Sequence, residues 1–127
     1  MNKKAIIITD GTESIQSIAK AISDLLNDYK VKIIPAEKFA GNDLLPANPF
    51  FIGCENPNPA SFAYLEEMLS HINLASRKCG IFSTNEQTFE YLKNIIKDSE
   101  ADLYDPLLII NTEDINSKTG EWIGKLI

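Results

Sequence analysis

The sequence predicts an α/β fold, a five-stranded parallel sheet covered by helices on both faces. Short apolar runs alternate along the chain with segments whose apolar residues recur at helical spacing. The run Leu107–Ile110 is apolar at every position, which is typical of a strand buried on both faces. Strand–helix alternation implies parallel pairing through right-handed crossovers, and residues 1–127 are interpreted as a single domain.

An apolar run followed by a stripe of apolar residues at helical spacing predicts the first strand, loop and helix. Ala5–Ile8 is an apolar run, and the stripe from Ile15 to Leu26 has the spacing of a helix buried on one side. A region rich in turn formers, residues 41–49, precedes the third strand. The predicted strands are Lys4–Ile8 (central), Val31–Pro35, Phe50–Cys54, Cys79–Phe82 and Leu107–Ile110. The predicted helices are Thr12–Asn27, one with Phe62, Leu65, Leu69 and Ile72 on one face, Glu86–Lys97 and Thr119–Ile127. The predicted core includes Ile6, Ile8, Ile52, Ile81, Phe82, Leu108 and Ile110.

Charge and hydropathy narrow the classes of function. The chain has a net charge of −6 and no basic stripe, which argues against nucleic-acid binding. No apolar run reaches the roughly 18–20 residues of a membrane span, so we expect a cytoplasmic monomer. The acidity suits docking to a basic partner protein, or it is only a solvated surface.

Cysteine and histidine are too few to indicate a metal site or a catalytic triad. Cys54 ends one predicted strand and Cys79 begins the next, so a four-residue offset would separate them by roughly 13 Å, too far for a disulfide. Core packing is the favoured role of both thiols, although Cys54 borders the predicted ligand edge. His71, the single histidine, is interpreted as a helix-terminal or solvated residue.

The loop after the first predicted strand is a candidate phosphate-binding loop. Its sequence is Thr9-Asp10-Gly11-Thr12-Glu13-Ser14, and a helix follows. The first amides of a helix have no intrahelical partner, and the helix dipole adds positive potential there. The hydroxyls of Thr9, Thr12 and Ser14 would add donors, whereas the carboxylates of Asp10 and Glu13 would oppose a dianion. In the alternative interpretation, Thr12 is a helix N-cap, Gly11 a turn residue, and no ligand binds.

Three further segments occur in order along the chain: Phe51-Ile52-Gly53-Cys54, the segment from Ile72 to Phe82, and 101–109 with 120–123. They resemble, in turn, the third strand, the entry into strand four, and the last strand with the closing helix of the flavodoxin family. The resemblance implies a three-layer sandwich with strand order 2-1-3-4-5, an order for which flavodoxin is a standard example. It also implies FMN as cofactor and electron transfer with a basic redox partner as the role.

The loops that would hold FMN depart from the family pattern. The family's phosphate loop reads Ser/Thr-x-Thr-Gly-x-Thr, whereas here glycine stands one position early. The loop after the third strand begins Glu55-Asn56-Pro57, where the family usually places a stacking aromatic residue. The loop after the fourth strand reads Ser83-Thr84-Asn85, where the family has glycines. Phe89 and Tyr91 remain as candidates for stacking, and helix packing is their favoured role.

Three functions are weighed on this basis. The first is an FMN-dependent electron carrier in which flavin binding is weak or lost. The second is a flavin-free module that binds another anion or a protein partner. The third is a phosphoacceptor receiver domain, which is disfavoured because the fifth strand ends Asn111-Thr112-Glu113 and offers no lysine. In each of the first two, the chain is a carrier or binding module more than a catalyst.

Overall fold

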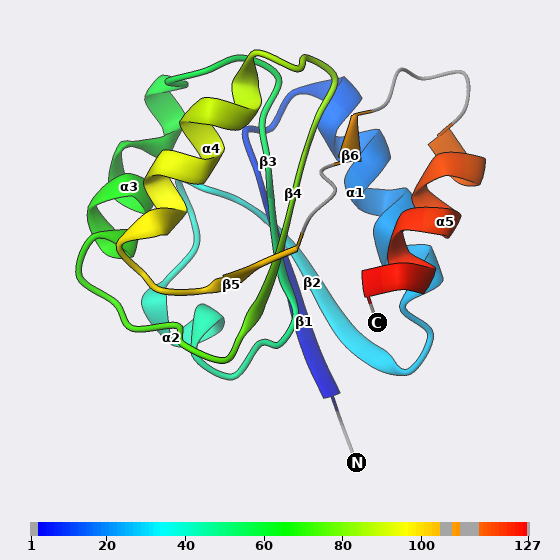
Figure 1. Cartoon of the computed structure of the whole chain (residues 1–127), viewed down its shortest axis with the longest axis horizontal. Coiled ribbons are helices and arrows are strands. Elements are labelled where there is room, and N and C mark those ends of the chain that lie inside the picture. The colour runs from blue at the N-terminus through cyan, green and yellow to red at the C-terminus, as the bar shows by residue number, and fades with distance from the viewer. Residues whose placement is uncertain (1–2, 105–107, 110–114, 127) are drawn as a thin grey trace.

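The structure is a computed structural model that describes residues 3–104, 108–109 and 115–126. It forms three layers, with a sheet between two layers of helices (Figure 1). The strands are β1 (Lys3–Thr9), β2 (Tyr29–Pro35), β3 (Phe50–Gly53), β4 (Lys78–Ser83), β5 (Asp102–Leu103) and β6 (Leu108–Ile109). The helices are α1 (Glu13–Leu25), α2 (Gly41–Leu44), α3 (Ala63–Leu69), α4 (Thr88–Lys97) and α5 (Ile115–Leu126), and the 3-10 turn η1 (Ala60–Phe62) leads into α3. Within the described residues, no helix is long and apolar enough to cross a membrane.

The sheet is parallel and has the strand order β2-β1-β3-β4-β5, as predicted. β1 lies inside the sheet between β2 and β3, and β3 holds the middle position. The fifth position differs from the expected single strand at 107–110. β5 pairs with the beginning of β4 and β6 pairs with its end. The sequence gives no signal for β5, because it has two residues and one of them is an exposed aspartate.

Other boundaries also differ from the predictions. α1 is shorter than Thr12–Asn27, and α4 begins at Thr88 instead of Glu86 because residues 85–88 form a turn closed by the Thr88 amide and the Asn85 carbonyl. The helix predicted around 62–72 is confined to α3 and η1. α5 begins at Ile115, before the predicted start at Thr119, because the first residues of this helix lack the apolar spacing from which a helix is predicted. α2 was expected as loop, because a single turn is too short to show periodicity.

Each face of the sheet carries its own apolar core. Ile6, Ile8, Ile52 and Ile81 pack on the face covered by α3 and α4. Phe82 packs with Ile7, Phe51 and Trp122 on the face covered by α1 and α5. These five predicted core residues are buried, as expected. The side chain of Leu108 and all of Ile110 lie outside the described residues.

Aromatic packing on the second face requires glycine in β4. A Cβ on Gly80 would lie 2.5 Å from Cη2 of Trp122 and 2.8 Å from Cδ2 of Phe51. The rings of Phe51 and Trp122 are themselves in contact, with centroids 5.7 Å apart. Trp122 on α5 therefore rests directly on the backbone of β4, and this contact holds α5 against the sheet.

We expect Gly80→Ala to lower the free energy of unfolding by about 1–3 kcal/mol, because the added methyl overpacks two rings. Gly120→Ala on α5 is the matched control, since its Cβ would meet no atom within 4 Å. This control should raise stability by roughly 0.5–1 kcal/mol through helix propensity. Urea unfolding followed by the fluorescence of Trp122 measures both, and a Gly80→Ala variant as stable as the parent would contradict the packing.

Candidate functional site

The loops that follow β1, β3 and β4 meet at the carboxyl-end edge of the sheet. The parallel register places Thr9 beside Gly53, and Gly53 beside Phe82. The structure therefore brings together the three loops that the sequence singled out, residues 9–14, 55–57 and 83–85. In open parallel sheets, ligands bind at this edge.

The side chain of Asp10 occupies the centre of this edge. One carboxylate oxygen, Oδ1, accepts hydrogen bonds from the Thr12 amide (3.0 Å) and the Thr12 hydroxyl (2.7 Å). The other, Oδ2, accepts one from the amide of Glu55 at 2.8 Å. Hydrogen bonds to an ionised acceptor are each worth about 1.5–3 kcal/mol. Asp10 thus ties the first loop to the second by its own charge.

Most of the hydroxyls expected to face an anion are engaged within the protein. Thr12 precedes α1 in extended conformation, yet its hydroxyl makes no capping bond to the helix and instead donates to Asp10. The Thr9 hydroxyl donates to Oε1 of Gln16 (3.2 Å) and accepts from the Gly11 amide (3.3 Å). Gly11 has φ +82°, a left-handed conformation that favours glycine at this turn. Within the described residues, the Ser14 Oγ is buried and has no hydrogen-bond partner.

The backbone of Glu55 links the second loop to the third. Its carbonyl accepts hydrogen bonds from the Thr88 hydroxyl (2.9 Å) and the Ser83 hydroxyl (3.4 Å). Ser83 Oγ also accepts from the Asn85 amide at 3.0 Å. Thr88, whose role the sequence did not reveal because it reads as part of an amphipathic helix, fixes the start of α4 to this loop. Asn56 and Pro57 are exposed and Thr84 is partly buried.

Beside these loops lies an open hollow with acidic walls. Glu13, Ser14, Ser17 and Glu55 line it, and its volume is about 390 Å³. Two of its four lining side chains are carboxylates, and Asp10 is bonded to the backbone of one of them. The positive end of α1 therefore faces three carboxylates, which lowers the potential that the helix terminus would offer an anion.

The two candidate stacking aromatics point away from this edge. Phe89 is buried in the core beneath α4. Tyr91 packs against Phe62, with ring centroids 6.4 Å apart, and its hydroxyl donates to Oε2 of Glu66 at 3.1 Å. Burial, followed by the neighbouring Glu66 carboxylate, raises the pKa of Tyr91. Both residues therefore have the packing role that the sequence favoured.

Solved structures of flavodoxins resemble this chain in fold. No family model matches the sequence, and no curated protein does. A short-chain flavodoxin associated with a bacterial microcompartment superposes with a TM-score of 0.84 over 99% of this chain and 97% of its own, at 14% identity. Flavodoxin 2 from Bacillus cereus gives a TM-score of 0.82 over 97% of both chains at 19% identity. A Fusobacterium nucleatum flavodoxin mutant bound to flavin mononucleotide gives 0.76 over 98% and 94%, at 12% identity.

The chain has the flavodoxin-like fold. The strand order of its sheet matches this fold, as the resemblance in the sequence implied. The superposition covers 97% of the length of each of these two flavodoxins. Sequence identities of 14% and 19% show the fold alone, so which ligand binds at the carboxyl-end edge follows from the residues of this chain.

The two cysteines of this flavodoxin-like domain belong to its apolar core. Both are buried, which agrees with the packing role that the sequence favoured, and both thiols are free. Burial, with a smaller effect from the Asp10 carboxylate, raises the pKa of Cys54 to about 12, so it remains a thiol at neutral pH. In the ranges that the structure describes, no group of three or more histidine, cysteine or carboxylate side chains is arranged to hold a metal ion. His71 is exposed beyond the end of α3, with Glu67 3.9 Å away.

Proposed function

We propose that this flavodoxin-like chain binds FMN weakly or not at all, and that its carboxyl-end edge serves as a binding surface for a cationic group on a partner protein. One observation carries the proposal. Asp10 places its carboxylate on the amide and hydroxyl donors where the phosphate of a bound flavin would need them.

The phosphate is the first point at which FMN does not fit. To bind it, the loop would have to release Thr12 from Asp10 or accept the dianion beside that carboxylate. Glu13 and Glu55 stand next to the same hollow and add repulsion. Losing two charge-assisted hydrogen bonds of about 1.5–3 kcal/mol each weakens binding by roughly two decades or more in Kd.

The flavin ring is the second point. Phe89 and Tyr91 face the core and α3, so neither supplies a stacking surface at the edge. Ser83 and Asn85, in place of glycines, are bonded to each other, and Ser83 also to Glu55. Stacking on an aromatic side chain contributes on the order of 1 kcal/mol, and this contribution is missing among the described residues of the three loops.

A cationic group suits the edge better than an anion does. Glu13 and Glu55 both line one open hollow, and the Ser17 hydroxyl beside them can accept a hydrogen bond as well as donate one. A lysine or arginine of a partner protein would be held there by charge-assisted hydrogen bonds. The net charge of −6 would attract such a partner from a distance.

FMN-dependent electron transfer is the second candidate function. The fold favours it, because several solved structures that resemble this chain are flavodoxins and one of these is bound to flavin mononucleotide. In that case the flavin would carry the electrons, and the chain's acidic surface would dock a basic redox partner.

Titration of FMN, followed by quenching of its fluorescence, separates the two candidates. We expect the parent protein to bind with a Kd in the micromolar range or weaker. Asp10→Ser should lower that Kd roughly tenfold or more, because it frees the Thr12 donors and removes one negative charge. Asp24→Ser removes the same charge from the far part of α1 and should leave the Kd within about twofold of the parent. Nanomolar binding by the parent would contradict the proposal.

A short arginine-containing peptide tests the cationic partner. Its addition should shift the amide resonances of residues 13–17 and 55 in a ¹H–¹⁵N spectrum, and Glu13→Gln should weaken this binding about threefold or more. Glu37→Gln, which removes an exposed carboxylate after β2, is the control and should have little effect. Peptide binding that is equal in the parent and Glu13→Gln would place the cation elsewhere.

A further inference from the structure

A second cavity, which is lined by basic residues, lies at the opposite end of the strands from the candidate site, where β1 and β2 begin. It has a volume of about 190 Å³ and is bounded by the first halves of these two strands, by α2 and by the residues that follow α2. Lys4, Lys30 and Lys32 line it, together with Ile6 and Ala47, which are almost fully buried. In a chain of net charge −6, three cations are thus gathered around one apolar floor.

The sheet register forces two of these cations together. Lys4 is the direct partner of Lys30 across the parallel pair β1–β2, and Ile6 is the partner of Lys32. Side chains at alternate positions of a strand share a face, so Lys4, Ile6, Lys30 and Lys32 all lie on the α2 side of the sheet. Like charges directly opposite each other cost stability unless an anion lies between them.

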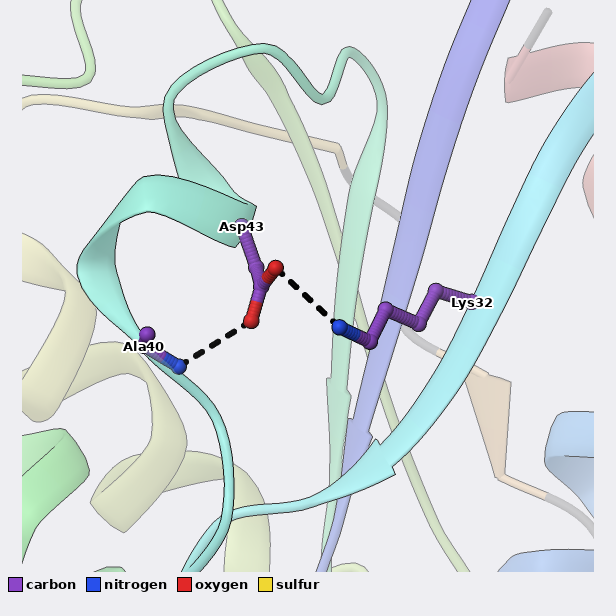
Figure 2. A network of polar contacts seen from close by, with 3 residues as sticks. All are labelled: Lys32, Ala40 and Asp43. Atoms are coloured by element: carbon purple, nitrogen blue, oxygen red, sulfur yellow. Dashed lines mark hydrogen bonds and ion pairs between the residues drawn. The ribbon is translucent and has the colours of Figure 1, made fainter.

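Among the residues that the structure describes, one of the three lysines has an acidic partner. Lys32 extends from β2 toward α2, and its Nζ lies 3.1 Å from Oδ1 of Asp43 (Figure 2). The other oxygen of Asp43 accepts a hydrogen bond from the Ala40 amide at 3.1 Å, which fixes the carboxylate in place. Within the described residues, Lys4 and Lys30 have no carboxylate at ion-pair distance. The cavity lining therefore carries three positive charges against one negative charge.

We propose that this cavity binds a small organic anion, a phosphate or carboxylate that carries a compact apolar group of about one ring. The anionic head would lie between Lys4 and Lys30, and the apolar group would rest on Ile6 and Ala47. A cavity of about 150 Å³ is known to accept benzene, so a volume of about 190 Å³ is sufficient for one ring. The lysine stems add apolar wall while their ammonium groups reach the head.

This inference does not depend on the proposed function. The cavity lies where β1 and β2 begin, and the acidic hollow lies beyond the carboxyl ends of β1 and β3, so a ligand at one does not touch the other. Substitutions at Lys4 and Lys30 therefore leave Asp10, Glu13 and Glu55 in place. Failure of one proposal would be seen separately from failure of the other.

Phenyl phosphate is the probe, titrated into the ¹⁵N-labelled protein and followed by ¹H–¹⁵N spectra that also report whether each variant is folded. We expect saturable shifts at the amides of residues 4–6, 30–32 and 47. Lys30→Gln and Lys4→Gln should each raise the Kd about threefold or more, because each removes one cation from the head group. Lys93→Gln removes an exposed lysine from α4 and is the matched control, with a Kd within about twofold of the parent.

Two half-probes separate the parts of the ligand. Inorganic phosphate lacks the apolar group and phenol lacks the charge, so each should bind more weakly than phenyl phosphate. Inorganic phosphate that binds as tightly as phenyl phosphate would show that the apolar floor is not used and would overturn the proposal. Shifts that do not saturate, or a Kd that Lys4→Gln and Lys30→Gln leave unchanged, would overturn it as well.

Discussion

The Asp10 carboxylate is the contact on which the carboxyl-end edge depends. It bonds the first loop to itself through Thr12 and to the second loop through the Glu55 amide. The Glu55 carbonyl in turn accepts a hydrogen bond from the Thr88 hydroxyl at the start of α4. The carboxylate of Asp10 and the backbone N–H and C=O groups of Glu55 thereby connect three loops that follow three strands. At this edge, the Asp10 carboxylate accepts the hydrogen bonds that a flavodoxin-like loop would otherwise donate to the anionic group of a ligand.

Charge is distributed unevenly between the two ends of the sheet. Beyond its carboxyl ends, Asp10, Glu13 and Glu55 surround the beginning of α1. Where β1 and β2 begin, Lys4, Lys30 and Lys32 surround a cavity in which Asp43 is the single counter-charge among the lining residues. The charges at the carboxyl ends of the strands therefore suit a cation, and those at the other end suit an anion. The acidic carboxyl-end edge is the reverse of what a phosphate site there requires.

The sequence predicted the scaffold well because burial leaves a local signal. Ile6, Ile8, Ile52 and Ile81 lie in runs whose apolar character is visible without any partner, and they are buried as expected. Elements without such a signal were missed: α2 has one turn, and β5 has two residues. For the candidate site, the sequence indicated which three loops meet at the carboxyl-end edge but not the contacts between them. The orientation of Asp10 depends on an amide 45 positions away in the chain, which no local pattern reveals.

The central claim is that the Asp10 carboxylate holds the Thr12 and Glu55 amides. A pH titration followed by ¹H–¹⁵N and carboxyl ¹³C spectra measures this directly. An amide that donates to a carboxylate changes its shift when that group ionises, so both amides should follow the same titration midpoint as the Asp10 carboxyl carbon. In Asp10→Asn the shared response should disappear. Amide shifts of Thr12 and Glu55 that do not follow the Asp10 titration would contradict the account.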